Sequence, residues 1–431
     1  MSLSEYLRTI RKSELVINTS VLISGTALAQ LIPVLLQPFL RRPFAPEIFG
    51  AYSVYLSILG ILVIISSFRY ELAIMLPKRE KDAANLLFLS LMLNFVFNFV
   101  LFVLIAIWRE KLSSFLNLPG KFGYYLYLVP VGVLLFGSYQ SINYWLLRKK
   151  RFTALSINKF TRRGFEGAVQ LGSKYAGITH FLILGDLLGH FSNLVSGIYQ
   201  SFLSGLKIDF FSRTRINYLA RKYIDYPKYS LIPALMSAGS SLLPVIFINK
   251  FYSLENAGYL DLSRMLLSLP LALISLSVSS VLMQKISEKF RNGESIFHDL
   301  SFILILISVI GAFEIIIIMF FGVNLFKLIF GSQWGFSGEI SRYLVWSYAI
   351  NFIVNSFVSI FISMNKIRLL SLWQFFYFIS ILTLLLFKER PFLDFIKIYV
   401  SIEIFCSIVI TLLMVSIVKK YENRLKYLSS T

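Results

Sequence analysis

The stretch SINKFTRRGFEGAVQLGSKYAG, residues 156–177, carries ionisable groups along one face of a predicted helix. Its polar members recur at spacings of 4, 3, 4 and 4: Lys159, Arg163, Glu166, Gln170 and Lys174. At about 100° per residue, these positions fall within an arc of roughly 80°. A Lys or Arg at the centre of a bilayer costs roughly 2.5 to 3.5 kcal/mol, so a lipid-facing stripe would be hard to insert. We therefore expect the stripe to face a watery, cationic cavity.

The composition around this stretch is that of a polytopic membrane protein. Hydrophobic residues make up 57% of the 431 residues and charged residues 15%, with a mean hydropathy of +0.72. Soluble proteins contain about 45 to 50% apolar residues, and a transmembrane helix needs about 20 of them in a row. We expect an all-α protein of about twelve transmembrane helices, which begin near Val16, Tyr52, Asn85, Tyr125, Ser156, Phe181, Tyr229, Gly258, Ile296, Ile340, Leu369 and Leu393.

The charge distribution predicts the topology. Basic residues concentrate in every second connection, including the run Arg148–Arg151, the stretch Lys207–Lys228 and the carboxy-terminal segment Lys419–Lys426. Cytoplasmic loops carry such an excess, so both termini are predicted to be cytoplasmic. The fifth helix is placed by this parity, because its polar stripe hides it from hydropathy. Without it, every later loop would invert and the mid-chain basic stretch would lie outside.

The net charge of +20 does not indicate nucleic-acid binding. The basic residues lie mostly at helix ends, where positive-inside insertion and the anionic headgroups of membrane lipids explain them, and no nucleic-acid-binding module is visible. The single cysteine, Cys406, excludes an internal disulfide.

Two segments suggest an internal duplication. Arg42-Pro-Phe-Ala-Pro-Glu-Ile-Phe-Gly50 and Lys250-Phe-Tyr-Ser-Leu-Glu-Asn-Ala-Gly258 match in a basic residue, an aromatic residue, a glutamate and a glycine at one offset of 208. Pro33 and Pro244 are near partners, displaced by about one turn, and predict helices that bend or gate. An even number of helices per half predicts a parallel repeat. The expected parts are an amino-terminal lobe at 1–206, a basic cytoplasmic linker at 207–228 and a carboxy-terminal lobe at 229–431.

Other ionisable residues lie inside predicted helices. In the sixth helix a second polar face follows spacings of 4, 3, 4 and 3: Asp186, His190, Asn193, Gly197 and Gln200. We expect it to line the same cavity as the first stripe, with Asp186 and His190 either bonded locally or moving protons.

Three further acids leave two interpretations each. Asp261 and Arg264 either neutralise each other or contribute to the cavity, since they lie three residues apart. Glu314 and Glu403 are either proton carriers or locally paired groups, because ionisation in an apolar run is costly.

Signatures of enzymes are absent from the sequence. It contains no G-x-x-x-x-G-K-[ST] phosphate loop, no pair of metal-ligand histidines at helical spacing and no Ser-His-Asp arrangement. The outer loops are predicted to be short, with the longest at 108–124 and 322–339. We therefore expect a transporter with no cofactor and no metal site.

Several motifs resemble a known family. Ser24-Gly-Thr-Ala27, Gln30-Leu-Ile-Pro33 and Pro46-Glu-Ile-Phe-Gly50 are similar to the opening of bacterial polysaccharide flippases of the Wzx or O-antigen type. The likeness continues through Arg69-Tyr-Glu-Leu-Ala73, Asp82-Ala-Ala-Asn-Leu86, Ile183-Leu-Gly-Asp186 and Ala257–Pro270. These motifs cover most of residues 20 to 285, and beyond about residue 300 only the hydropathy is shared.

The resemblance implies a member of the multidrug, oligosaccharidyl-lipid and polysaccharide (MOP) exporter superfamily, with two six-helix lobes in the bacterial cytoplasmic membrane. It implies a flippase that moves oligosaccharides linked to undecaprenyl pyrophosphate to the outer leaflet, with the pathway's polymerase as a partner. A pyrophosphate suits a cationic lumen, which would comprise Lys159, Arg162, Arg163, Lys174 and Arg264. Arg162 lies at the edge of the stripe, where lipid headgroups are its alternative partner. The candidates for ion coupling are Glu166, Asp186, His190, Asp261 and Glu314.

Two alternatives stay open. A drug or small-molecule exporter of the same superfamily would share the fold, but cations in the cavity disfavour cationic drugs. A membrane polysaccharide polymerase or ligase would be an enzyme with a large outer loop.

Overall fold

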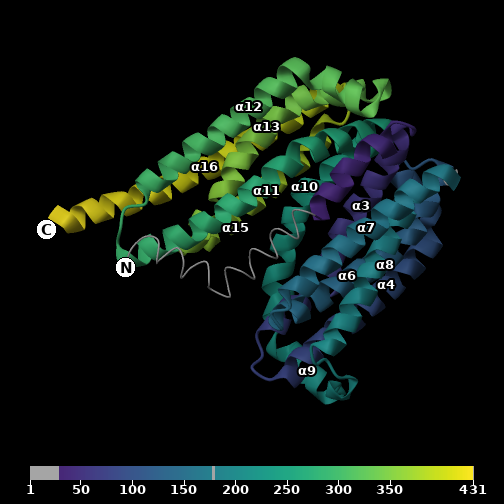
Figure 1. Cartoon of the computed structure of the whole chain (residues 1–431), viewed down its shortest axis with the longest axis horizontal. Helices are drawn as coiled ribbons and strands as arrows, with labels where there is room; N and C mark the ends of the chain where they lie inside the picture. The colour runs from purple at the N-terminus through teal and green to yellow at the C-terminus, as the bar shows by residue number, and fades with distance from the viewer. Residues whose placement is uncertain (1–28, 177–179, 431) are drawn as a thin grey trace. The chain divides into compact units, whose positions relative to one another are not determined.

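The computed structural model describes residues 29–176 and 180–430, and these residues form helices with no strand among them (Figure 1). The predicted all-α class is confirmed. Residues 29–41 are helical. The long helices that follow are α3 (Pro46–Ser66), α4 (Glu80–Phe115), α6 (Leu128–Arg148), α7 (Phe152–Ala176), α8 (Phe181–Leu203), α10 (Leu231–Phe251), α11 (Leu254–Asn292), α12 (Phe297–Phe330), α13 (Gly335–Phe357), α15 (Ile367–Leu382) and α16 (Phe392–Ser430).

Short helices connect them. These are η1 (Tyr70–Met75), α5 (Gly120–Gly123), η2 (Tyr124–Tyr127), η3 (Ile208–Phe210), α9 (Arg213–Lys222), η4 (Tyr226–Ser230), η5 (Ser332–Trp334), α14 (Ser359–Ser363) and η6 (Thr383–Phe387).

Ten segments of the described chain are long and apolar enough to cross a membrane. They correspond to ten of the twelve predicted spans. The span predicted near Val16 begins outside the described residues. The other is the span predicted near Ser156. It forms the 25-residue helix α7, which is long enough to cross a membrane but less apolar than the ten segments. At 1.5 Å per residue, α7 measures about 37 Å, which exceeds the roughly 30 Å of a hydrocarbon core.

The two outer loops expected to be longest are mostly helical. Helix α4 continues to Phe115 through most of the loop expected at 108–124. In the loop expected at 322–339, α12 runs to Phe330 and α13 begins at Gly335, with only Gly331 and η5 between them. Helices α12 and α13 are thus joined by a tight hairpin.

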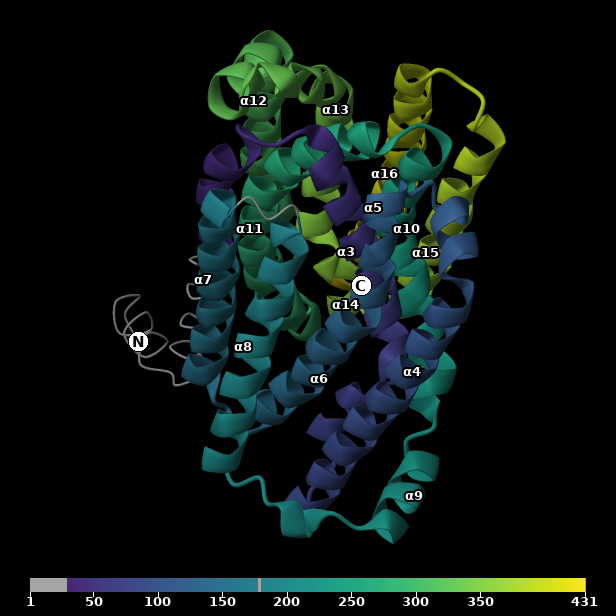
Figure 2. The same ribbon diagram turned by 90° about the vertical axis from the view of Figure 1, so that its right-hand side faces the viewer.

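Contacts divide the chain into two compact units. Unit 1 comprises the chain up to Phe44 together with Ala51–Ala238, and unit 2 comprises Ala45–Gly50 and Gly239–Thr431. In unit 1, α8 packs between α7 and α6, and α6 also packs on α4 (Figure 2). One apolar core of this unit surrounds Trp145, which is fully buried and donates its indole N–H to the Ser204 hydroxyl at 3.1 Å.

The stretch predicted as a linker is an ordered part of unit 1. Helix α9 buries Ile216 and Leu219 in the same core as Trp145, at one end of the helices of this unit (Figure 2). The Asn85 side chain makes two hydrogen bonds to the segment that precedes α9. It donates to the Phe210 carbonyl at 2.7 Å and accepts from the Ser212 N–H at 2.8 Å. The basic stretch is therefore held against the end of α4.

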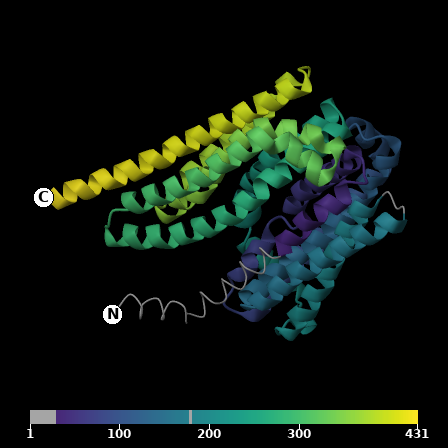
Figure 3. The same ribbon diagram turned by 45° about the horizontal axis from the view of Figure 1, so that its top comes forward.

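In unit 2, α13 packs against α11, α12 and α16, and these helices run side by side in Figures 1 and 3. Its core includes the fully buried Ile307, Phe361 and Ile410. The outer surface of α12 is also apolar, with Phe302 67% and Phe320 72% exposed. Such exposed apolar side chains would be unfavourable in water, so they are typical of a helix that faces lipid.

The two glycines of the suspected repeat occupy matching positions. Gly50 lies in the first turns of α3 and Gly258 in those of α11, and both belong to unit 2. A Cβ atom on Gly50 would overlap the Leu254 carbonyl, and one on Gly258 would overlap the Pro46 carbonyl. The two contacts are related by the same offset of 208, so each glycine permits the close approach of the other's helix. This symmetry supports the predicted duplication, whose lobe boundaries stay a prediction.

The prolines predicted to bend helices both lie in helical residues. Pro244 is buried inside α10, where it cannot donate the usual backbone hydrogen bond, and Pro33 lies in the helix of residues 29–41. Their part in gating stays a prediction.

Candidate functional site

The polar faces of α7 and α8 pack against each other because two glycines remove side chains from the contact. A Cβ on Gly185 would lie 2.6 Å from Gln170 Cγ, and one on Gly189 would lie 2.9 Å from the Arg162 carbonyl oxygen. Gly185 and Gly189 form a G-x-x-x-G pattern, which lets membrane helices approach closely. The pattern is visible in the chain but was not among the predicted site features.

This packing also explains how α7 tolerates its charges. The strongly exposed apolar side chains of the helix are Ile157, Phe160 and Phe165, each about half exposed. On the opposite side, Glu166 is 5% and Gln170 6% exposed. Glu166 and Gln170 thus lie against α8, whereas Lys159 and Arg163 are only partly buried. That the stripe borders a cavity stays a prediction.

Two ion pairs occupy the centre of this interface. The Arg162 Nη2 atom lies 3.2 Å from Asp186 Oδ1, and Arg163 Nη1 lies 2.7 Å from Glu166 Oε2. The carboxylates are almost inaccessible, while the side chains of Arg162 and Arg163 are 20% and 30% exposed. The guanidinium groups therefore reach further toward the surface than their counter-ions.

Helix α6 supplies the floor of the cluster. The Phe136 ring lies 4.6 Å from the His190 ring and 5.6 Å from the Arg162 guanidinium, a cation–π distance. His190 Nε2 is 3.5 Å from Asp186 Oδ1, too long for a strong hydrogen bond. Asp186 thus faces both Arg162 and His190, and the spacing of four residues on α8 places Asp186 and His190 on one face.

Several buried polar atoms here have no hydrogen-bond partner among the described residues. They include Asp186 Oδ2, His190 Nδ1, Arg162 Nε, Asn193 Oδ1 and Gln200 Oε1. Native proteins pair more than about 90% of their buried polar groups, so a concentration of unpaired groups marks a functional site or bound water. Along the same interface, Ser196 donates to Asn158 at 2.7 Å and accepts from Gln200 at 3.3 Å.

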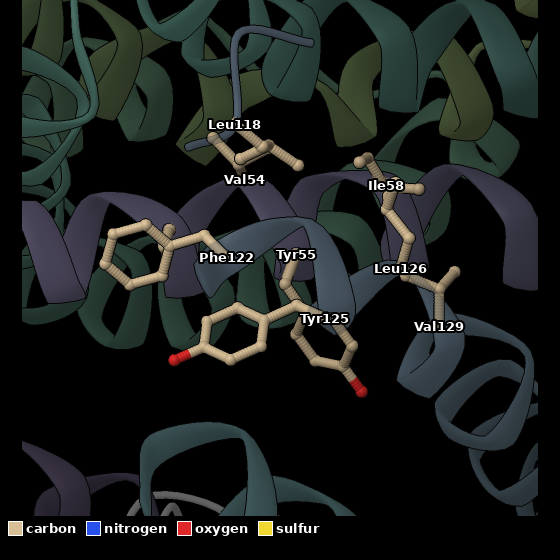
Figure 4. A pocket seen from close by; sticks show the side chains of 9 residues that line it. Val54, Tyr55, Ile58, Leu118, Phe122, Tyr125, Leu126 and Val129 are labelled. Carbon is tan, nitrogen blue, oxygen red and sulfur yellow. The ribbon is translucent and has the colours of Figure 1, made fainter. Parts of the chain in front are cut away.

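Two tyrosines of α3 complete the surroundings, and the sequence analysis missed them. Tyr52 interacts electrostatically with Asp186, Glu166 and both arginines, and Tyr55 with Asp186 and Arg162. Their spacing of three residues, which places both on one helix face, was the available signal. Tyr55 also lines a small apolar pocket with Phe122, Tyr125 and Leu126 (Figure 4).

Other predicted residues lie apart from this cluster. Lys159 is half-buried one turn before Arg163 on α7, and the side chain of Lys174 lies outside the described residues. Arg264, in unit 2, donates to the Tyr348 hydroxyl at 3.2 Å and to the Ser241 carbonyl at 2.7 Å. Asp261 lies one turn before it and interacts with it electrostatically.

Two acids of unit 2 differ sharply in their surroundings. Glu314 Oε2 is buried on α12 without a hydrogen-bond partner in the described part of the chain. Glu403 is 5% exposed and accepts from Tyr377 Oη at 2.5 Å and Asn351 Nδ2 at 2.9 Å. Glu403 is thus a locally bonded carboxylate, one of the two interpretations that the sequence left open.

The unit 1 cluster balances two guanidinium groups against two carboxylates. Arginine presents five N–H donors in a planar fork that matches phosphate geometry. The described residues contain no group of three or more His, Cys, Asp or Glu side chains that could hold a metal ion. What the cluster offers is two adjacent, partly exposed guanidinium groups in an apolar helical bundle.

Comparison with solved structures defines the class of fold. The chain is similar to an inward-facing multidrug resistance MATE family transporter of the MOP superfamily, with a TM-score of 0.71 and 15% identity over 93% of this chain and 96% of that one. It is equally similar to the lipid II flippase MurJ in an inward closed conformation, with a TM-score of 0.72 and 10% identity over 96% and 93%. A MOP superfamily transporter from Pyrococcus furiosus matches with a TM-score of 0.55 and 14% identity, over 96% of both chains. The fold is that of the MOP transporters, as the resemblance implied.

The sequence itself matches one protein family over most of its length. The family is described as polysaccharide biosynthesis protein, and it matches residues 39–338. This chain belongs to that family. No curated protein sequence matches it.

Proposed function

We propose that this chain is a flippase that moves undecaprenyl-pyrophosphate-linked oligosaccharide repeat units from the cytoplasmic to the outer leaflet of the bacterial cytoplasmic membrane. It acts by alternating access, and exchange of an ion at Glu166, Asp186 or another buried acid resets the cycle. The protein is a transporter and not an enzyme. Its cargo and membrane lipids are its partners, and the pathway's polymerase takes over the units that it delivers.

The observation that carries this proposal is the pair Arg162 and Arg163. A membrane helix seldom carries two adjacent arginines, because each is costly away from water unless it faces a partner. Here both guanidinium groups are partly exposed beside a buried polar interface, which suits a cargo with adjacent phosphates. Membership of a polysaccharide biosynthesis family supports an oligosaccharide as the rest of the cargo.

The deciding experiment reads the sidedness of lipid-linked oligosaccharide in cells lacking this protein. Lectin or glycosidase access in spheroplasts distinguishes the two leaflets. We expect single repeat units to accumulate on the inner face, inaccessible to the probe. Units that are accessible outside but unpolymerised would replace the flippase with a polymerase or ligase.

The residue-level test uses complementation of the same cells with Arg163→Ala, Arg163→Lys and the matching Arg162 variants. We expect alanine to abolish export and lysine to restore it only in part, because an ammonium cannot make bidentate phosphate contacts. Full glycan export by every variant would remove the arginine pair from the site.

A drug exporter is the second candidate, because the similarity to the multidrug MATE transporter is as strong as that to MurJ. The two cargoes differ in charge at the site. Export of cationic dyes by cells that express this chain, with no change in lipid-linked oligosaccharide, would favour that candidate.

A further inference from the structure

We propose that Asp186 and Glu166 are built-in counter-ions, which the pyrophosphate of the cargo displaces from Arg162 and Arg163 and which later displace the pyrophosphate. The inference rests on the proposed function, and it assigns the two acids a role in cargo exchange. It predicts an unusual phenotype: removal of either carboxylate tightens cargo binding while it slows transport.

The Arg162–Asp186 pair has the geometry of a contact that can be exchanged. It is a single contact of 3.2 Å, longer than the 2.7 to 2.9 Å typical of a charge-assisted bond. Asp186 Oδ2 and Arg162 Nε are both buried without a partner in the described chain, so neither group fulfils its bonding capacity. A buried ion pair contributes stability only when its remaining lone pairs and protons are also bonded. This pair is therefore a poor stabilising device.

The arginines keep donors for a second anion. Arg162 and Arg163 each make one bond to a carboxylate, although a guanidinium group has five N–H donors. Phe136 supports the Arg162 guanidinium from one side, so the group keeps its place when its anion changes. The arginine side chains are also more exposed than their acids, which lets an outside anion approach from the open side.

Displacement has a defined consequence for the acids. When phosphate oxygens bind Arg162, Asp186 still has His190 Nε2 at 3.5 Å. Glu166 lies on the same helix as Arg163, one turn away, so it returns as soon as the phosphate leaves. The other groups that face these carboxylates are Tyr52 and Tyr55 of α3. Because cargo and carboxylate compete for one guanidinium, each weakens the binding of the other to the same degree.

The test measures binding of farnesyl pyrophosphate to the purified full-length chain in detergent, with farnesol as the uncharged comparison. The variants are Asp186→Asn and Glu166→Gln, with Asp186→Glu to restore the charge. The matched control is Glu71→Gln, which removes a buried carboxylate of unit 1 outside the cluster. Thermal unfolding of each variant confirms that it is folded, and the two acids provide independent measurements.

We expect Asp186→Asn and Glu166→Gln to bind farnesyl pyrophosphate about 5- to 150-fold more tightly than wild type, the range of a typical coupling between sites. Asp186→Glu and Glu71→Gln should bind as wild type, and the double variant Arg162→Ala/Arg163→Ala should lose most binding. In spheroplasts, the two tight-binding variants should translocate lipid-linked oligosaccharide more slowly.

Three results would overturn the inference. Unchanged or weaker binding by both acid variants, with binding still lost in the arginine variant, would make the carboxylates positioning residues and leave the proposed site intact. If Glu71→Gln also bound farnesyl pyrophosphate more tightly, the change in the protein's net charge would explain the effect, and the two acids would have no special role. Normal binding by the arginine variant would refute the inference together with the proposed site.

Discussion

Glu71 is a buried carboxylate on η1, between the membrane-spanning helices α3 and α4. Its side chain is 3% exposed, accepts a hydrogen bond from the Ser67 hydroxyl and lies 3.4 Å from Arg69 Nη1. Burial raises the pKa of Glu71 above its ordinary value of 4.5, and the bonds from Ser67 and Arg69 only partly oppose this rise. The folded protein therefore holds this proton more strongly than the unfolded chain does.

The sign of the resulting pH dependence follows from that difference. The stability from the protonated Glu71 is fully present below pH 4.5 and is lost as pH rises through the elevated folded pKa. We expect Glu71→Gln, which keeps an acceptor for Ser67 but does not titrate, to raise the unfolding temperature by a few degrees at pH 8 and by less at pH 5. The exposed Asp209→Asn is the control. A difference between Glu71→Gln and wild type that is constant from pH 5 to pH 8 would contradict the argument.

At the scale of helices, the crossing of α7 and α8 depends on Gly189. An added methyl group would lie 2.9 Å from the Arg162 backbone oxygen and 3.0 Å from Glu166 Cβ, so the two helices would have to separate. We expect Gly189→Ala to destabilise the protein by about 1 to 3 kcal/mol, as overpacking does, and to impair export because Arg162 and Asp186 move apart. Thermal unfolding in detergent and complementation measure the two effects.

Gly164, on α7, provides the matched control. A Cβ there meets no atom within 4 Å. Alanine has a higher helix propensity than glycine by about 1 kcal/mol, so Gly164→Ala should be neutral or stabilising. If both alanine variants behaved alike, the close contact at Gly189 would not determine the crossing.

The position of α9 depends on Asn85 at the start of α4. Its amide bonds the backbone of Phe210 and Ser212, immediately before α9. We expect Asn85→Ala to raise hydrogen–deuterium exchange in α9 by about 5- to 30-fold, because two partly buried hydrogen bonds of about 1 kcal/mol each are lost. Asn217→Ala, an exposed position on α9 itself, should leave exchange unchanged. Equal exchange in both variants would show that Ile216 and Leu219 alone hold the helix.

Across the whole molecule, composition and periodicity predicted what depends on local chemistry. The membrane class, the helical spans and the pairing of the α7 and α8 faces follow from apolar length and from spacings of three and four. The contacts within the site did not follow, because they depend on which helices adjoin. Two glycines let α8 approach the stripe closely, and Arg162, at the edge of the stripe, lies 3.2 Å from Asp186. Tyr52 and Tyr55 belong to the site because α3 packs beside it, and the spacing of residues within one helix does not show which helices are neighbours.

Whether α7 crosses the membrane determines the topology of everything after it. Its apolar side chains face outward and its polar stripe lies against α8, so the insertion cost that burdens an isolated polar helix is reduced here. Cys406 is buried, and Cys406→Ala gives a background for single cysteines at the exposed positions Lys121, Lys150, Asp209 and Lys388. With α7 across the membrane, an impermeant maleimide should label cysteines at 121 and 388 in intact spheroplasts. Those at 150 and 209 should react only after permeabilisation. If α7 does not cross, the labels at 209 and 388 exchange sides while those at 121 and 150 keep theirs, because only the chain beyond α7 inverts.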